Sequence, residues 1–216
     1  MQKMATHIDF IKDVTISKMQ CKLKVRVVRL REVPNRFNSD TTFSIELVLQ
    51  DEKGDQIHAS IGKSVLHLFK TQINELGLYH MANFIVYHNK EKFNTTKHRL
   101  RLTFTQRTTV AEITDPLFPM NIFDLRPYDQ LINKIDVNKT ELFDVIGEIV
   151  GFSEVHMHKQ GKISRKFMDI ELQDNERKKL SATFWGKFID EIIPHMLSSN
   201  NQPIIVVMQL IKAYKF

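Results

Sequence analysis

The chain has 216 residues, a formal net charge of +6 and a hydrophobic content of 42%, which is enough to build packed cores. Glycine and proline are too few for a largely disordered chain, and no apolar run is long enough for a membrane span. The N-terminus lacks the basic and then apolar order of a secretory signal, and the single cysteine, Cys21, excludes an internal disulfide and a four-cysteine zinc site. We therefore expect an intracellular protein with no membrane partner.

The basic excess lies in the first half of the chain. Residues 1–112 contain 18 Lys and Arg against 11 Asp and Glu, whereas residues 113–216 contain 13 against 14. A basic surface favours polyanions, nucleic acid above all, although a charge of this size also suits a simply solvated surface. The charge alone leaves both interpretations open.

The first half predicts a small β-rich domain. Residues 22–29 alternate apolar with basic side chains, which indicates a half-buried strand with one basic face. Helical spacing of the apolar residues before Gly77 predicts a single helix. The predicted elements are strands over 22–29, 43–49 and 56–61, a helix over 63–76, and strands over 78–87 and 97–105.

Residues 113–137 connect the two halves, and Pro116, Pro119 and Pro127 interrupt them, so we expect a linker rather than a domain. A second set of elements follows, in which two strands alternate on either side of a turn at Asp174. These elements are a strand over 142–152, a loop over 153–164, a hairpin over 167–184, a helix over 186–197 and a strand over 204–211. No counterpart to the last strand of the first half precedes the end of the chain.

The two halves repeat one pattern. Setting Gln50 on Gln173 places Ile57 on Leu180 and keeps the alternation of both hairpins in phase. The interval is too long for a solenoid repeat, so we interpret it as a duplicated domain. The predicted domains are residues 1–112 and 138–216, joined by the linker over 113–137.

The order strand, strand, strand, helix, strand, strand is that of the oligonucleotide/oligosaccharide-binding (OB) fold, a five-stranded Greek-key barrel. We therefore predict a mainly β protein with two tandem OB-fold barrels, the second of them short of its last strand. Two explanations of the short barrel stay open: the chain is truncated, or the barrel is open and its exposed edge needs a partner. An OB barrel binds its ligand on the face of strands two and three and on the loops beside them.

The sequence contains no recognisable motif for catalysis. It lacks a phosphate-cradling glycine loop, a Gly-x-Ser-x-Gly elbow and a His-Glu-x-x-His helix. His156 and His158 would place two imidazoles on one side of a strand, but no third metal ligand accompanies them, so an exposed loop is the simpler interpretation. We predict a protein that is not an enzyme and that needs no metal or other cofactor.

Aromatic and basic residues at the predicted binding face favour nucleic acid as the ligand, because single strands are held by stacking on rings and by cations along the backbone. Trp185 ends the third strand of the second repeat with the parity opposite to Phe184, which favours an exposed ring over a core position. Phe93 lies in a polar loop, where an apolar ring is costly unless it meets a ligand. The predicted nucleic-acid-binding residues are Arg29, Arg31, Arg36, Lys63, Phe93, Arg165, Lys166, Trp185, Lys187, Tyr214 and Phe216.

The repeats resemble the tandem central DNA-binding domains of the replication protein A large subunit, in particular the diverged plant large-subunit-like proteins. The resemblance covers residues 15–216. The matching segments are Phe43-Ser44-Ile45-Glu46-Leu47, Lys92-Phe93, Asp144-Val145-Ile146-Gly147, Ile170-Glu171-Leu172-Gln173-Asp174 and Ala182-Thr183-Phe184-Trp185-Gly186. The resemblance implies a Trp185 that stacks on a base, and a role in the nucleus in DNA replication, repair and recombination.

The chain departs from this family in two respects. Ile61-Gly62 stands where the first domain of the family has a stacking phenylalanine, and we expect neither the zinc-bearing third domain nor the trimer-forming helix of the family. We therefore expect the first domain to bind weakly or through charge alone. We do not expect the chain to join a heterotrimer in the usual way.

These observations favour single-stranded DNA binding with low sequence specificity, with other replication or repair proteins as further partners. RNA stays open as a ligand, because stacking does not read the 2′-hydroxyl. The alternative is a diverged OB-fold protein–protein interaction module with little affinity for nucleic acid, because a fold alone does not fix a function.

Overall fold

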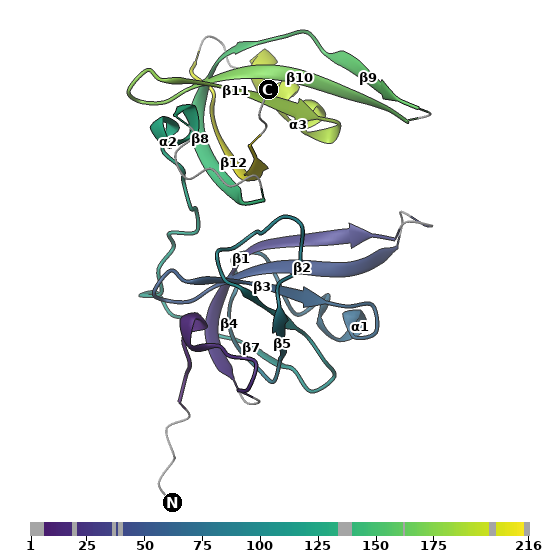
Figure 1. The fold of residues 1–216 in the computed structure, drawn as a ribbon, viewed down its shortest axis with the longest axis vertical. Coiled ribbons are helices and arrows are strands. Elements are labelled where there is room, and N and C mark those ends of the chain that lie inside the picture. The colour runs from purple at the N-terminus through teal and green to yellow at the C-terminus, as the bar shows by residue number, and fades with distance from the viewer. Residues whose placement is uncertain are drawn as a thin grey trace, which may run out of the picture. The chain divides into compact units, whose positions relative to one another are not determined.

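The chain folds into two compact units, Met1–Ile122 and Phe123–Phe216, in a computed structural model (Figure 1). The structure describes residues 7–18, 21–35, 38, 41–133, 140–161, 163–198 and 202–213. Each unit is built around one curled sheet, and the structure confirms the predicted fold class of tandem OB barrels. Among the described residues, no helix is long and apolar enough to span a bilayer.

The sheet of the first unit closes into a barrel. Its strand order is β5-β6-β3-β2-β1-β4-β7, with β3 and β6 parallel and the other neighbours antiparallel. Only Asn83 and Phe84 separate β4 from β5, so one interrupted strand joins the two sides of the sheet. The elements are η1 (Ile11–Asp13), β1 (Lys22–Pro34), β2 (Thr42–Gln50), β3 (Gln56–Ile61), α1 (Leu66–Phe69), β4 (Leu78–Ala82), β5 (Ile85–His88), β6 (Leu100–Thr103) and β7 (Thr109–Glu112).

Alternate apolar side chains of these strands fill the barrel. Val25, Leu47 and Ile57 are fully or almost fully buried, as the period-two pattern predicts. Phe104 closes one part of the core, where its ring makes edge contacts with Phe69 at 5.1 Å and Phe84 at 5.3 Å between centroids. This interior fixes which side chains of β2 and β3 face outward, and therefore which ones can meet a ligand.

The second unit has an open sheet in the order β11-β10-β8-β12, and β9 pairs with the far part of β10. In the described part of the chain, no further strand pairs with the outer edges of β11 and β12. Its core contains Val145, Met168, Ile170, Leu172 and Ile189. The elements are α2 (Tyr128–Ile132), β8 (Leu142–Phe152), β9 (His156–Gln160), β10 (Ile163–Gln173), β11 (Lys179–Trp185), α3 (Lys187–Ser198) and β12 (Ile205–Lys212).

The turns between the hairpin strands are built alike in the two units. Asp51 and Asp174 begin them, and each donates its N–H to the carbonyl oxygen four residues on, at 3.0 Å. In both turns the aspartate Oδ1 also accepts N–H groups from the second and fourth following residues. Gly54 and Arg177, three residues after each aspartate, share the left-handed conformation with φ of +85° and +65°. The register that related Gln50 to Gln173 therefore holds at the level of single hydrogen bonds.

Some predicted elements are wrong or incomplete. The helix predicted over 63–76 is a single short α-helix, Leu66–Phe69; at the end of the predicted range, Leu76 N–H donates to the Val27 carbonyl at 2.7 Å and Gly77 O accepts from Val27 N–H at 2.9 Å. The backbone there joins β1 instead of extending a helix. The loop predicted over 153–164 contains β9, which forms a hairpin with β10. The boundary between the two compact units, Ile122 to Phe123, falls within the predicted linker over 113–137, whose last residues lie outside the described part of the chain.

Candidate nucleic-acid interface

Three aromatic side chains line up across the second unit on the outer face of the hairpin strands. Trp185 on β11 and His156 on β9 are both direct register partners of Phe167 on β10. The Phe167 ring centroid lies 5.2 Å from that of Trp185 and 5.4 Å from that of His156, with tilted ring planes. Met168 next to them is buried, so alternation puts all three on the outward side. We call Trp185, Phe167 and His156 the aromatic row.

Trp185 is 42% exposed, so one part of the indole is open to solvent while another part contacts neighbouring rings. His158 contacts it edge-on at 5.9 Å between centroids. His158 is also the register partner of Arg165, and both side chains are exposed. Trp185, His158 and Arg165 therefore combine exposed rings with a cation. Single-strand binding needs this combination.

The other predicted cations of the second unit are already engaged in ion pairs within the unit. Lys166 forms an ion pair with Asp190, and Lys187 lies 4.0 Å from Glu191 and 5.5 Å from the Phe188 ring centroid. Lys187 is well exposed, so a phosphate can compete for it in solution. Tyr214 and Phe216 lie outside the described residues.

The equivalent place in the first unit has no rings. Register pairs Ile45 with Ile61 in the first unit and Met168 with Phe184 in the second, so the next outward positions, Ser44 and Gly62, stand where Phe167 and Trp185 stand. A Cβ at Gly62 would meet nothing within 4 Å. The first barrel therefore keeps an open place on its β2–β3 face, where the second barrel has its indole.

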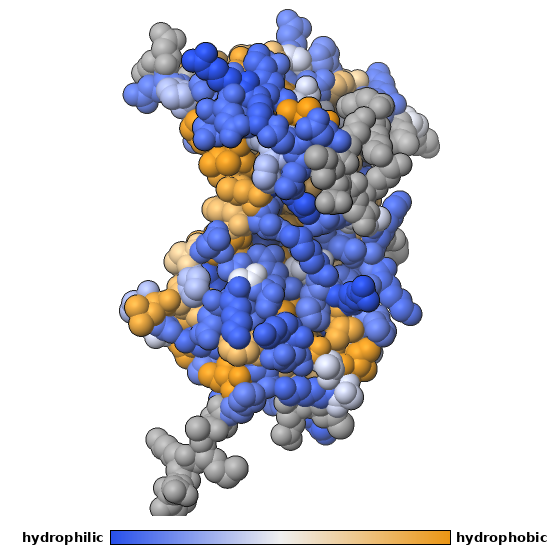
Figure 2. Space-filling view, turned by 60° about the vertical axis from the view of Figure 1, so that its left-hand side comes forward, coloured by the Kyte–Doolittle hydropathy of each residue, from blue (hydrophilic) through white to orange (hydrophobic). Residues whose placement is uncertain are grey.

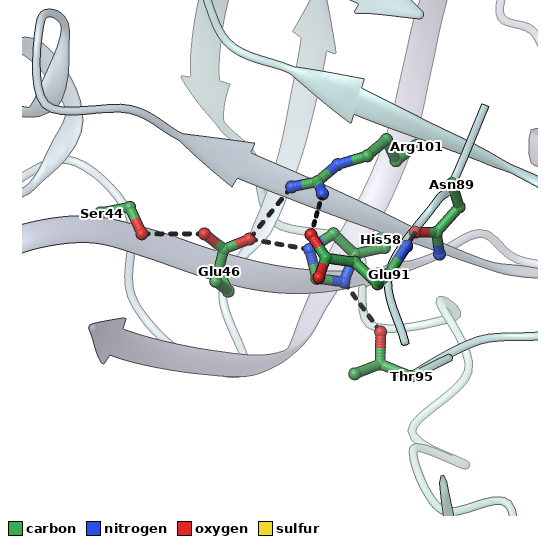
Figure 3. Close-up of polar contacts among 7 residues, drawn as sticks. All are labelled: Ser44, Glu46, His58, Asn89, Glu91, Thr95 and Arg101. Atoms are coloured by element: carbon green, nitrogen blue, oxygen red, sulfur yellow. Dashed lines mark hydrogen bonds and ion pairs between the residues drawn. The ribbon is translucent and has the colours of Figure 1, made fainter. Parts of the chain in front are cut away.

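A polar network covers much of this face in the first unit (Figure 3). His58 on β3 lies 2.8 Å from a carboxylate oxygen of Glu46 through Nε2, and 2.8 Å from Thr95 Oγ1 through Nδ1. Arg101 on β6 bridges Glu46 and Glu91. Burial acts to raise the pKa of Glu46, but hydrogen bonds from His58 and Ser44 and the charges of His58 and Arg101 outweigh it, so the pKa lies below its ordinary value.

The polar network fixes the loop between β5 and β6, which contains Phe93. Thr95 and Glu91 belong to this loop, and their contacts with His58 and Arg101 tie it to the outer face of β3 and β6. Phe93 is half-buried, and the ammonium of Lys92 lies 5.6 Å from its ring centroid. The predicted loop aromatic thus lies on a segment that is held beside the binding face.

Two cations of the basic strand predicted in the first unit, Lys24 and Arg26, contact the segment that follows β7. Arg26 is only 8% exposed; it donates to the Leu76 carbonyl at 2.7 Å, and its guanidinium lies 5.3 Å from the Phe118 ring centroid. Lys24 forms an ion pair with Asp115 at 2.5 Å. These two cations fasten the segment after β7 to the barrel.

The cations of the first unit that we predicted to bind phosphates are residues other than Lys24 and Arg26. Arg29 pairs with Glu75 at 2.9 Å, Arg31 and Lys63 are exposed, and Arg36 lies outside the described residues. The face of this unit drawn in Figure 2 is mainly hydrophilic, and its hydrophobic residues form small, separate patches. This surface offers charge to a ligand rather than a broad apolar area.

Three residues of the interface were not predicted as such: Phe167 was missed, and His156 and His158 were considered only as metal ligands and assigned to an exposed loop. Phe167 shares the outward parity of Asp169 and Glu171, which is the signal that could have found it. The two histidines belong to a strand whose sequence, His156 to Gln160, lacks apolar alternation, and only its pairing with β10 shows it to be a strand.

A chain with two OB barrels in tandem, one of them carrying exposed rings across its hairpin strands, belongs to the class of OB-fold proteins. The family model described as "Domain of unknown function DUF223" matches residues 12–134, which is more than half of the chain. The chain therefore belongs to the DUF223 family.

Two relatives confirm the resemblance to the replication protein A large subunit. The chain is 23% identical over 202 residues to a replication protein A 70 kDa DNA-binding subunit of Arabidopsis thaliana, and the match covers 90% of this chain and 31% of the relative. It is 25% identical over 184 residues to the replication protein A 70 kDa DNA-binding subunit of Xenopus tropicalis, covering 83% and 28%. The chain thus spans less than a third of the length of either relative.

A solved structure shares the fold. The structure of a replication protein A heterotrimer bound to single-stranded DNA superposes with a TM-score of 0.62, at 19% identity, over 95% of this chain and 47% of that one. At this identity the match establishes the architecture, and the function has to be argued from the residues.

Proposed function

We propose that the chain binds single-stranded DNA with low sequence specificity. The observation that carries this proposal is the aromatic row on an OB barrel, in which Trp185 and His156 are exposed and Phe167 is half-buried, with Arg165 on the same strand as Phe167. Bases stack on such rings whatever their sequence, because every base has a π-face. The known range for single-strand-binding proteins, replication protein A included, is about 1–3 kcal/mol per stacked base.

Exposed cations would follow the phosphate backbone. Arg165 and Lys187 flank the aromatic row, and Arg31 and Lys63 supply charge in the first unit. Because the first unit has Gly62 in place of a ring, its contribution would come from charge and from the loop that contains Phe93. Such contacts release counterions, so binding should weaken markedly as the salt concentration rises.

The names of the relatives support a cellular setting for this activity. We propose a non-enzymatic role in DNA replication, repair or recombination in the nucleus, together with other proteins of these processes. The relatives are named as DNA-binding subunits of replication protein A, and this chain matches only a part of each.

Titration of the protein with fluorescent oligo-dT, beside a duplex of equal length at low salt, tests the proposal. We expect tight binding to the single strand and weak binding to the duplex. Trp185→Ala should weaken single-strand binding by about 5- to 150-fold, the equivalent of one stacked base. Phe188→Ala is the matched control, because it removes an exposed ring on α3 outside the aromatic row.

The alternative is an OB-fold module that binds other proteins and has little affinity for nucleic acid. The missing ring at Gly62, and the outer edge of β12 with no partner strand among the described residues, favour it. No binding to oligo-dT at low salt, equal binding to the duplex, or an unchanged affinity in Trp185→Ala would reject our proposal in its favour.

A further inference from the structure

The hairpin of β9 and β10 places His156 in the aromatic row and His158 beside it. His156 lies 5.4 Å from the Phe167 ring, and His158 lies 5.9 Å from the Trp185 ring, between centroids. The two alternate on β9, so both project on the side of the hairpin that carries Trp185. Both are exposed, and no hydrogen bond or ion pair of either side chain occurs among the described residues.

The charged groups that the structure describes around these histidines are not paired with them, so a phosphate can contact the two imidazoles. On β10, Arg165 is the register partner of His158, and Asp169 on the same face accepts a hydrogen bond from Thr183. Lys166 points to the other side, where Asp190 of α3 neutralises it. Glu154, just before β9, and Lys159, on β9, flank the pair, and both are exposed.

We propose that His156 and His158 are nucleic-acid-binding residues that couple binding to protonation, an inference that rests on the proposed function. Imidazole rings stack on bases as other aromatic side chains do, so His156 lengthens the stacking surface by one ring. A protonated imidazole donates from both nitrogens and carries a positive charge, so it also pairs with a phosphate. A bound polyanion therefore favours the protonated form, and acid strengthens binding.

The first unit shows the contrast. Its histidine on the corresponding face, His58, is buried and has Glu46 and Thr95 as partners on its two nitrogens. Both nitrogens of His58 are therefore engaged by groups of the protein itself. In the second unit the histidines face solvent, where a ligand can supply the opposing charge.

The test is a titration of oligo-dT at about pH 8 and about pH 6 over a series of salt concentrations. We expect binding about three- to tenfold tighter at the lower pH, because histidine ordinarily changes charge in this range. Each added phosphate contact on a single strand steepens the dependence of log K on log salt by about 0.7, so two should add about 1 to 1.5.

Three variants make the result specific. In the double variant His156→Gln and His158→Gln, affinity and salt slope should no longer change with pH. In the double variant His156→Arg and His158→Arg, binding should stay tight at both pH values. His195→Gln removes an exposed histidine of α3 in the same unit and should keep the full response of the wild type.

The possible outcomes separate the two proposals. Oligo-dT binding whose pH response survives in the glutamine variant overturns the role of His156 and His158 and leaves the proposed function intact. An absence of wild-type binding at both pH values overturns the proposed function and this inference with it. Loss of the pH response in His195→Gln as well would show that the effect is not specific to the hairpin.

Discussion

Gly62 and Trp185 occupy equivalent places at the ends of β3 and β11, and they give the two units different surfaces. Register relates Ile61 to Phe184 and therefore Gly62 to Trp185. One barrel presents an indole next to a phenyl ring, and the other presents backbone next to Ser44. The space above Gly62 is open, so this difference depends on single side chains and not on the shape of the barrel.

Restoring the ring in the first unit should therefore add affinity. Gly62→Trp is expected to tighten oligo-dT binding by about fivefold or more, because a stacked base contributes about 1–3 kcal/mol. The control is Gly62→Ala, which adds a Cβ to open space and supplies no ring. Equal affinities of the tryptophan and alanine variants in the titration would show that this face of the first unit does not meet the strand.

The sequence predicts part of the interface at this scale. Alternation with Phe184 assigned Trp185 to the outward side, and the structure has it partly exposed. Alternation could not find His156 and His158, because their importance comes from a register with β10 that spans a turn. It also could not show that Arg26 is buried under Phe118, since that contact joins residues 92 positions apart.

At the scale of elements, the packing of α2 against β8 depends on one glycine. Tyr128 at the start of α2 is 4% exposed, and burial, together with the charge of Asp174, raises its pKa to about 12. A Cβ at Gly147 would lie 2.1 Å from the Tyr128 hydroxyl oxygen and 3.1 Å from the Gln173 carbonyl oxygen. The glycine therefore makes the space that this ring occupies.

Gly147→Ala should destabilise the second unit. An added methyl group in so close a contact forces Tyr128 or the strand to shift, at a cost of about 1–3 kcal/mol. Urea denaturation followed by tryptophan fluorescence measures it, because Trp185 is the only tryptophan and belongs to this unit. Gly151→Ala on the same strand is the control, because its nearest contact would be an ordinary 3.5 Å. Equal unfolding midpoints for the two variants would contradict the packing argument.

Elements were predictable where local patterning decides the structure. The strand predicted over 142–152 is confirmed as β8, which has the same bounds, Leu142–Phe152. The helix predicted over 63–76 is wrong outside Leu66–Phe69, and at the end of the predicted range Leu76 and Gly77 bond to Val27 in β1. Helical spacing cannot register a competing hydrogen bond to a strand about 50 residues away in sequence.

At the scale of the whole molecule, the two units contribute different things. Residues 1–112 carry the net positive charge, whereas the second unit carries the aromatic row. Two weak or unequal sites on one chain reinforce each other when a single ligand reaches both, because the second contact becomes intramolecular. Binding should therefore depend on the length of the strand.

A series of oligo-dT lengths tests this dependence. An OB fold covers about 4–16 nucleotides, so an oligonucleotide of about 8 should engage one unit and one of about 30 should be able to engage both. We expect the longer strand to bind more tightly than its greater number of binding registers explains. A gain that equals this statistical factor would show that one unit alone binds.

Residues 113–122 pack against the first barrel, and this packing determines where a fragment that contains the first barrel should end. Asp115 pairs with Lys24, and Phe118 covers Arg26, so these residues complete the surface of the barrel although they follow its last strand. A fragment cut after Glu112 would uncover a buried guanidinium and remove its carbonyl partners at Phe118 and Pro119. A separate first half that is meant to fold and to bind should therefore extend to Ile122.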